Sequence, residues 1–595
     1  MKHSKLSITA SWGNQGKVKS VQIQSPKPRT TAARIVVAVI AVGFFGIMTY
    51  LMHPPISIHY FMSYVWLTLL MLLLGLLYSL FANARRASAA DGSRTEIPHF
   101  RTIVSLPVLI GLALTFVSNP LFASQTYANL MDVQQSSFSE WDDKLLVEGI
   151  SLMDTESATR VGSRELGSLQ DVVSQFDDDV YYQIIVNGTP QKVSPLQYVG
   201  FFTWLNNRGT GTPGYVSVDP IRQSADYHEL ESIDGTGDGM RYVPSGRLND
   251  NLARHLWLRY PTEVLGTTHF ELDDEGHPFY VTQVYGFRTP MGAEYVKGVI
   301  VTDPTDGSTE LHDAANVPEW LDVVYDGELL DWMYDCHGAY SGGFWNSLFG
   351  QVGCTRTGGD YGYVMIDGEQ WIYTGVTSMG NDASNIGFLL ASEKTGESFF
   401  LPMASADEAS AMSSAEGKVQ QFRYEASFPS LVSIDGQPTY VMVLKDSAGL
   451  IRLYAMVNAE SYNVVACEPD LVSCKDAYER AMRSAGIEFS SDRQEMPEVD
   501  STGATSGTTP SGTDSAANAE RFSIVVVQVQ LADDAGDTYL YVLSDDGDVY
   551  RIRFADDPKA CMGLSSGDQL SGSAVDAGTF WEVVELDAAF TSTEG

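Results

Sequence analysis

Basic residues are scarce in this chain. Its 595 residues include 37 Lys and Arg against 75 Asp and Glu, which gives a formal net charge of −38. The imbalance lies after position 102, where 26 basic residues face 73 acidic ones. Proteins that bind nucleic acids neutralise phosphates with Lys and Arg, so this composition argues against a nucleic-acid partner. An acidic surface favours cationic partners, and it also serves simply to keep a domain soluble.

The common catalytic motifs are missing as well. The chain has no His-Glu-x-x-His and no Gly-x-x-x-x-Gly-Lys-Ser/Thr loop. Lys394-Thr395-Gly396 matches the last element of penicillin-binding enzymes, but no Ser-x-x-Lys precedes it, and Ser461-Tyr462-Asn463 follows it instead. We therefore predict two strands joined by a Glu-Lys-Thr-Gly turn, in which Gly396 has positive φ. No catalytic residue is assigned.

Charge is nearly absent from three long hydrophobic runs, at 34–53, 60–81 and 103–123. Each is close to the ~20 residues that a helix needs to cross a bilayer. None has a polar stripe, and backbone inside lipid must bond to itself, so we predict three transmembrane helices in 34–123. A cleaved signal peptide is the alternative for the first run, and it would have a shorter apolar region and a small-residue cleavage site.

Lysines and arginines around these runs predict the orientation. The tail 1–33 and Arg34 carry seven basic residues and no acid, so this end is expected in the cytoplasm. The loop between the second and third runs has four arginines and is expected there too. An odd number of crossings then leaves the rest of the chain outside the plasma membrane.

The outer part is expected to contain two domains of an α+β protein. Residues 124–497 mix helical patterns with strands joined by Asn-Gly and Asp-Gly turns, which predicts antiparallel sheets. One helix is predicted across 316–335, with Pro318 in its first turn. The Gly/Ser/Thr-rich stretch 498–520 is predicted to be a linker, and the short strands of 521–595 predict a small OB-like β-barrel.

Cysteine is rare, and an exported location permits disulfides. Sequence proximity predicts the pairs Cys336–Cys354 and Cys467–Cys474, with Cys561 left over. A zinc site is the alternative, but there are no paired Cys-x-x-Cys clusters, and His337 is the only histidine at ligand spacing.

Two loops are candidate binding sites. In "DGTGDG" the oxygen-bearing side chains of Asp234, Thr236 and Asp238 alternate as at the start of a calcium loop, although Ser245 occupies the twelfth position where a glutamate is expected. A plain Gly/Asp turn is the alternative, and calcium is the only cofactor considered. In "CHGAYSGGFWNSLFG" the aromatic residues Tyr340, Phe344 and Trp345 lie among glycines and form a candidate binding surface. Burial of these rings in the core is the alternative.

Part of the chain resembles a known group of sequences. "LMDTESATRVGSRELGSL", "WIYTGVTSMGNDASNIGFLLASEKTGE" and the segment from "SSAEGKVQQF" to "ESYNVVA" resemble an uncharacterised family of bacterial membrane proteins with a few N-terminal spans and a large outer domain. The resemblance implies a location in the cell envelope and assigns no activity. The hairpin "YVKGVIVTDPTDGSTEL" is weakly similar to the strand-turn unit of PepSY domains.

These observations predict a membrane-anchored extracytoplasmic binding or assembly protein of the bacterial envelope, with an envelope or membrane protein as a possible partner. The alternative is an envelope hydrolase or transferase whose site is not visible as a motif. Convergent carboxyl groups of raised pKa in a cleft would favour the enzyme. Transport is a third interpretation, which is weakened because the spans contain no Asp, Glu, Lys or Arg beyond their ends.

Overall fold

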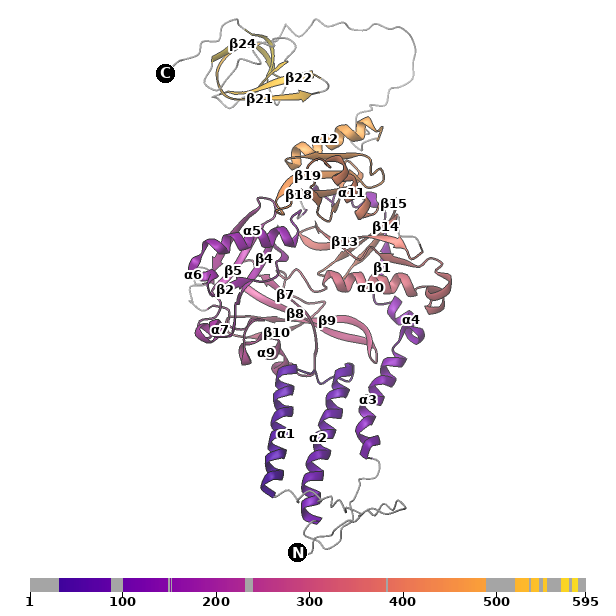
Figure 1. The fold of residues 1–595 in the computed structure, drawn as a ribbon. Coiled ribbons are helices and arrows are strands. Elements are labelled where there is room, and N and C mark those ends of the chain that lie inside the picture. The colour runs from indigo at the N-terminus through magenta and orange to yellow at the C-terminus, as the bar shows by residue number, and fades with distance from the viewer. Residues whose placement is uncertain are drawn as a thin grey trace, which may run out of the picture. The chain divides into compact units, whose positions relative to one another are not determined.

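The computed structural model describes residues 31–86, 100–147, 150, 152–230, 239–380, 384–487, 520–534, 537–544, 549–553, 569–576 and 581–586. It divides into two compact units, Met1–Met496 and Pro497–Gly595. The first unit begins with apolar helices and continues as a large sheet-rich domain (Figure 1). The mixed α+β class is confirmed.

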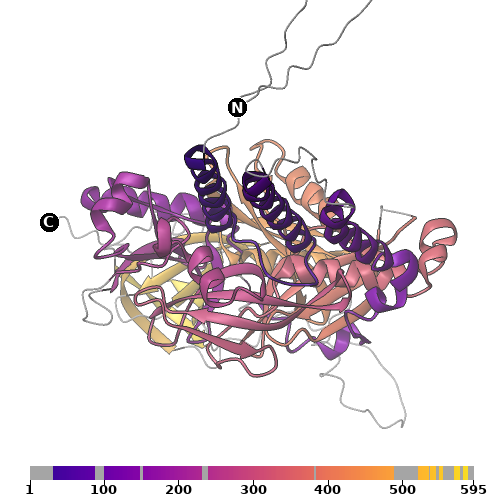
Figure 2. The same ribbon diagram turned by 90° about the horizontal axis from the view of Figure 1, so that it is seen from below.

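The apolar helices are α1 (Thr31–Met52), α2 (Phe61–Arg86) and α3 (Phe100–Val117). Seen from below, they run side by side under the sheet-rich domain (Figure 2). Ala32–Met52 and Phe61–Phe81 are long and apolar enough to cross a membrane.

The third predicted span differs from the other two. Its helix breaks after Val117, and α4 (Pro120–Ala128) continues at an angle of 58°. Asn119 Oδ1 accepts a hydrogen bond from Leu121 N at 3.0 Å, which caps α4. Pro120 has no N–H with which to extend the preceding helix. The prediction of three transmembrane helices, the third with a kink at its prolines, is therefore corrected to two candidate spans and a bent pair, which counts as a third only if it is taken as one span.

Four sheets build the sheet-rich domain, and most neighbouring strands in them are antiparallel. The first is β1 (Val133–Gln135), β15 (Ser398–Ser405), β14 (Asn385–Ser392), β13 (Glu369–Ser378) and β11 (Thr355–Thr357), with β12 (Gly362–Ile366) paired to β13. The second is β10 (Thr309–Asp313), β9 (Gly292–Thr302), β8 (Pro278–Thr289) and β7 (Val264–Leu272). The third is β16 (Glu425–Ala426), β18 (Gln437–Lys445), β19 (Ile451–Asn458) and β20 (Val465–Glu468), with β17 (Ser430–Ile434) paired to β18. The fourth is β2 (Phe176–Asp178), β4 (Thr189–Tyr198), β5 (Gly214–Asp219) and β6 (Ser224–Glu229), with β3 (Tyr182–Val186) paired to β4.

Local sequence explains several of the hairpins. Asn187 and Gly188 join β3 to β4 with φ values of 50° and 76°, the two positive values that a tight two-residue hairpin requires. The predicted Lys394-Thr395-Gly396 turn is also confirmed, because it joins β14 to β15 and Gly396 has φ 73°. Ser392 Oγ accepts hydrogen bonds from the backbone N–H groups of Lys394 and Thr395.

Helices cover the sheets and complete three apolar cores. They are α5 (Thr155–Ser168), α6 (Gln170–Val173), α7 (Phe201–Asn207), α9 (Leu252–Arg259), α10 (Gly327–Tyr340), α11 (Glu408–Lys418) and α12 (Leu471–Ser484), with short turns η1 (Phe138–Glu140), η3 (Leu248–Asp250) and η4 (Asn346–Gly350). The helix predicted across 316–335 forms only from Gly327 onward, where Asp326 Oδ1 caps it by accepting from Leu329 N at 2.8 Å. Trp320 to Asp326 are non-helical.

The second unit is a closed barrel of β21 (Glu520–Asp534), β22 (Asp537–Ser544), β23 (Val549–Arg553), β25 (Trp581–Leu586) and β24 (Gln569–Asp576). Residues 521–595 were predicted to form a barrel, and its described strands do so. β23 and β25 are parallel, whereas the other neighbouring strands are antiparallel. Ile524, Val526, Leu540, Val542 and Ile552 are among the residues that fill the barrel. The predicted linker lies outside the described residues except for Glu520.

Candidate functional site

A cavity of about 370 Å³ lies where three of the sheets meet. β3 and β4 form one wall, β7 another, and β12 and β13 a third. It is lined by Thr155, Val180, Tyr181, Tyr182, Gln183, Ile184, Lys192, His269, Phe270, Glu271, Val323, Glu328, Tyr361, Tyr363, Gln370 and Glu393. Aromatic rings and ionisable groups therefore share one buried space, as in many small-molecule sites.

Lys192 is the only Lys or Arg among these lining residues. It lies on β4, directly across from Gln183 on β3, and its exposed fraction is 2%. Its Nζ makes no hydrogen bond or ion pair within the described part of the chain, and it lies over the Tyr363 ring, 5.9 Å from the ring centroid. Burial lowers the pKa of Lys192 from 10.5 to about 8, although the Asp154 carboxylate opposes this effect.

Asp154 does not serve as the partner of Lys192, because it is already engaged. Its Oδ2 lies 2.5 Å from Lys445 Nζ, and its Oδ1 caps α5 by accepting from Ser157 N at 2.9 Å. Burial acts to raise the pKa of Asp154, but the bonds to Lys445 and Ser157 outweigh it and hold that pKa below its ordinary value. Lys192 therefore keeps an unpaired amine beside an occupied carboxylate.

Glu271 on β7 anchors one wall of the cavity. Its Oε2 and Oε1 accept hydrogen bonds from the backbone N–H groups of Asp322, at 2.9 Å, and Val323, at 3.2 Å. Burial raises the pKa of Glu271 well above its ordinary value, and the neighbouring Asp322 adds to the shift. Asp322 in turn accepts from Ile185 N on β3, and burial raises its pKa to about 7. These bonds hold the non-helical segment before α10 against two sheets.

Glu393 closes the opposite wall. Its Oε2 accepts from Gln370 Nε2 at 2.6 Å, and its backbone carbonyl accepts from Val324 N and Tyr325 N, at 2.8 Å each. Burial raises the pKa of Glu393 to about 8. At neutral pH this carboxyl group is therefore mostly protonated and can donate a hydrogen bond.

Several polar atoms at the cavity have no hydrogen-bond partner in the described residues. They are His269 Nε2, Gln183 Oε1 and Gln370 Oε1. Buried polar atoms in native proteins are normally bonded, so a ligand or water is the expected partner. Burial also lowers the pKa of His269, which is therefore neutral at pH 7. A protonated Lys192, a mostly protonated Glu393 and a neutral His269 therefore share this cavity with the carboxyl groups of Glu271 and Glu328.

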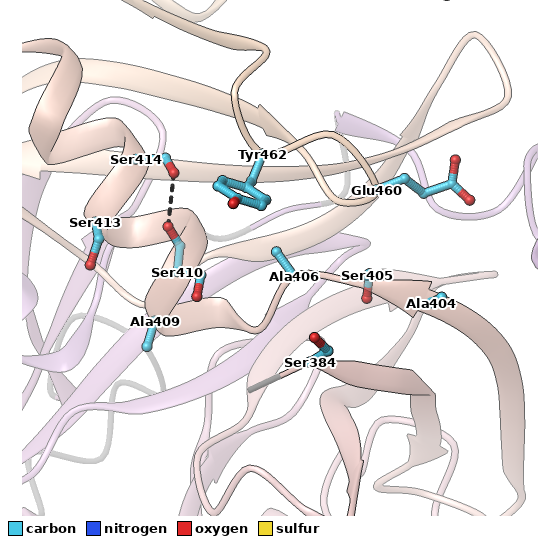
Figure 3. A pocket seen from close by; sticks show the side chains of 10 residues that line it. All are labelled: Ser384, Ala404, Ser405, Ala406, Ala409, Ser410, Ser413, Ser414, Glu460 and Tyr462. Atoms are coloured by element: carbon cyan, nitrogen blue, oxygen red, sulfur yellow. Dashed lines mark hydrogen bonds between the residues drawn. The ribbon is translucent and has the colours of Figure 1, made fainter. Parts of the chain in front are cut away.

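Two other hollows lie around α11. The larger, of about 720 Å³, is lined by small side chains and Tyr462 (Figure 3). Ser410, Ser413 and Ser414 come from α11, and the Ser414 hydroxyl donates back to Ser410 O at 2.9 Å. Glu460 is the only ionisable carboxyl in this lining. The polar groups that this hollow offers to a ligand are therefore serine hydroxyls, one carboxyl group and the Tyr462 side chain.

The second hollow by α11, of about 400 Å³, is acidic. Asp335, Asp360, Asp407 and Glu408 line it together with Arg356. Burial raises the pKa of Asp335 and Glu408, and it raises the pKa of the adjacent Asp331 to about 6. Among the described residues no group of three or more His, Cys, Asp or Glu is placed to hold a metal ion.

The predicted aromatic site is only partly exposed. Tyr340 ends α10 with its ring edge-on to Tyr127, at a centroid distance of 6.3 Å, and Phe344 is half-buried. Trp345 is exposed and stacks on Phe349 at 5.9 Å. These rings line none of the three hollows described above.

The predicted disulfides are corrected, because Cys336, Cys354, Cys467 and Cys474 are free thiols. The Sγ atoms of Cys354 and Cys467 face the backbone carbonyls of Ala339 and Ala415. Cys474 donates to Tyr454 O at 3.3 Å in the third sheet. The thiols of Cys354, Cys467 and Cys474 thus contact backbone carbonyls of other elements rather than a partner sulfur.

The remaining predicted site residues, Asp234, Thr236 and Asp238, lie outside the described residues, as does Cys561. The sequence reasoning also missed the cavity. Lys192, His269, Glu271 and Glu393 are far apart in the chain and match no motif. The strand "TPQKVSPLQY" has Lys192 as its single charged residue, and a lone lysine in a buried strand could have indicated the cavity.

No protein-family model matches the chain, and no curated protein matches it.

Proposed function

We propose that this chain is a membrane-anchored binding protein of the bacterial cell envelope, and that its sheet-rich domain binds a small organic anion in the Lys192 cavity. The observation that carries the proposal is the buried amine without an ionic partner, which faces a space large enough for a small molecule. A carboxylate on the ligand would supply the missing partner, and the surrounding tyrosine rings would cover an apolar or aromatic body.

Neutral Glu393 and the unpartnered amide oxygens add specificity to this proposal. A protonated carboxyl donates to a ligand oxygen, whereas Gln183 and Gln370 accept from a ligand hydroxyl or N–H. A ligand with both an acid and a hydroxyl or amino group satisfies more of these atoms than a simple acid does. The proposed class is therefore a small hydroxy- or amino-substituted carboxylic acid.

The anchor belongs to the same proposal. α1, α2 and the bent pair α3–α4 act as three crossings, and the basic tail 1–33 stays in the cytoplasm, so the sheet-rich domain and the barrel lie outside. Membership in the uncharacterised envelope family is proposed on the segments quoted above. Protease added to intact cells should then digest a tag at Gly595, and protection of that tag until the cells are permeabilised would contradict this topology.

We also propose that the barrel is OB-like. Five strands in the order β21-β22-β23-β25-β24, with β23 parallel to β25, support this assignment. OB-folds bind their ligands on one face of a five-stranded barrel. The acidic composition disfavours an oligonucleotide there, so an envelope polymer or protein is the proposed partner of the barrel.

Ligand binding is tested on the full chain in detergent after extensive dialysis. The probes are benzoate, 4-hydroxybenzoate, phenylalanine and lactate, added singly, and the readout is the thermal midpoint Tm. At a ligand concentration of 100 times Kd, binding stabilises the folded state by about 2.7 kcal/mol. We expect at least one probe to raise the Tm of wild type and of Lys297→Met, an exposed lysine variant, but not of Lys192→Met. Equal responses in all three proteins would contradict the role of Lys192.

An envelope hydrolase remains the second candidate, because the hollow beside Asp335 and Glu408 brings carboxyl groups of raised pKa together. Such groups can serve as general acids. Release of soluble fragments from purified cell wall by wild type, and its loss in Asp335→Asn, would support this function. Equal release by the variant would remove Asp335 from it.

A further inference from the structure

The helix α7 exposes its apolar side rather than burying it. Phe201, Phe202 and Leu205 are exposed, as is Val199 just before the helix, and Phe202 has an exposed fraction of 77%. Only Trp204 points inward, where its Nε1 donates to Asp250 Oδ2 at 3.1 Å. That bond fixes the helix with its other large side chains outward. A soluble surface rarely carries such a contiguous apolar patch without a partner.

A short chain of contacts places α7 beside the end of α1. Asp250 belongs to η3, and its neighbour Asn249 accepts a hydrogen bond from the Tyr50 hydroxyl of α1 at 2.7 Å. Arg254 on α9 donates to Tyr50 O at 3.1 Å, and Trp257 donates to Pro54 O at 2.9 Å. Figure 1 shows α7 and α9 at the level where α1 enters the sheet-rich domain.

More apolar side chains are exposed on η3 and α9 themselves. They are Leu248 and Leu258. We call α7 together with the exposed side of η3 and α9 the juxtamembrane face. This face adjoins the end of α1, a helix that is long and apolar enough to cross a membrane. The surface that the face meets is therefore expected to be close to that membrane.

The charge of the juxtamembrane face is opposite to that of the domain. Residues 199–208 and 247–259 contain four arginines and one acid, Asp250, whereas the chain after position 102 has 26 basic and 73 acidic residues. Arg208, Arg247 and Arg259 are exposed, and Asp250 is buried. Exposed arginines beside exposed Phe and Leu are typical of segments that lie in a lipid headgroup layer.

We infer that the juxtamembrane face lies in the headgroup layer of the membrane that α1 crosses, with Phe201, Phe202 and Leu205 inserted among the acyl chains. The arginines bind lipid phosphates around them. The domain is then held at a fixed orientation by a second contact besides its helices. This inference does not depend on the ligand proposed for the Lys192 cavity.

The test uses the full chain in vesicles of 70% phosphatidylcholine and 30% phosphatidylglycerol, with a benzophenone amino acid in place of Phe202. The control carries the same group at Phe422, which is also exposed and follows α11 in the chain. Figure 1 shows α11 well away from α1. After illumination, intact-protein mass spectrometry should show a lipid adduct at position 202 at least fivefold above position 422. Equal lipid adducts at both positions, or an adduct of position 202 to a second polypeptide, would overturn the inference.

The arginines are tested in the same vesicles. We expect the adduct at position 202 to contain phosphatidylglycerol above its share of the lipid, and Arg208→Gln with Arg259→Gln to abolish that enrichment. An adduct with the bulk lipid ratio in the unsubstituted protein would overturn the role of the arginines. Unchanged thermal midpoints of all variants serve as the check that folding is intact.

Discussion

Replacing Lys192 with methionine should stabilise the dialysed protein, because the side chain keeps its length and loses its charge. The pKa of Lys192 falls from 10.5 to about 8 on burial. Each pH unit corresponds to about 1.36 kcal/mol, so the protonated amine costs the folded state about 3 kcal/mol below pH 8. Methionine removes this cost and fits the same stem.

The pH dependence gives the sign of the effect. The pKa of Lys192 is about 8 in the folded state and 10.5 in the unfolded state, so the unfolded state binds more protons between these two pH values. The cost is therefore complete below about pH 8, shrinks as the pH rises from 8 to 10.5, and vanishes above that range. The stability gain of Lys192→Met should follow the same course.

Thermal unfolding of the full chain between pH 6 and 10 measures this gain. An unfolding entropy of about 2.1 cal/mol/K per residue, over roughly 370 residues of the sheet-rich domain, converts about 3 kcal/mol into about 4 °C in Tm. We expect this increase at pH 7 and at most half of it at pH 9.5. Lys297→Met is the control, because Lys297 is exposed and pairs with Glu263. A lower Tm for Lys192→Met at pH 7, or a gain independent of pH, would refute the argument.

Three further predictions follow from contacts elsewhere. Asp154→Asn should cost about 2–3 kcal/mol at pH 7, because it weakens the cap of α5 and leaves buried Lys445 with only the Glu156 carboxylate, at 3.8 Å, as a charge partner. The pKa of Asp154 is lowered, so this loss shrinks as the pH falls below the ordinary value of 3.8 and is gone below the folded-state pKa. Asp367→Asn, at an exposed pair, should have little effect in the same melts. Gly214→Ala should destabilise by at least about 2 kcal/mol, since its Cβ would lie 1.9 Å from His228 O, whereas Gly417→Ala meets nothing within 4 Å and should not reduce Tm. Alkylation of unreduced, denatured protein should modify Cys336, Cys354, Cys467 and Cys474 completely, and a disulfide-linked peptide in the mass spectrum would show that these thiols pair.

Local sequence was sufficient where neighbouring residues decide the structure. The hydrophobic runs predicted the helices α1 and α2, because an apolar stretch of that length without a polar stripe has few other stable states. The Lys394-Thr395-Gly396 turn and the Asn187-Gly188 hairpin were likewise predictable, since Gly adopts positive φ at little cost. In each case the evidence lies within a single short segment.

The failed helix prediction shows where local reasoning ends. Trp320, Leu321 and Val324 recur at helical spacing, yet the segment from Trp320 to Asp326 is non-helical. The side chain of Glu271 takes the N–H groups of Asp322 and Val323, and the carbonyl of Glu393 takes those of Val324 and Tyr325. These partners are some 50 to 70 positions away in the sequence, and they satisfy the backbone groups that a helix would otherwise bond.

The cavity was unpredictable for the same reason. Lys192 is an ordinary strand residue in the sequence, and its chemistry arises only when β4 is covered by β7 and β13 so that its amine loses water and gains no carboxylate. The disulfide prediction failed because closeness along the chain does not orient two sulfur atoms.

Composition, hydrophobic length and the helix, strand and turn patterns therefore determined that this is an acidic α+β protein with apolar N-terminal helices, because those properties depend on each segment by itself. Only the tertiary structure decided that Cys336, Cys354, Cys467 and Cys474 are free thiols, and that Lys192, Glu271 and Glu393 share one buried space. Burial and pairing set the pKa of each of these groups, and both depend on which distant strands pack together.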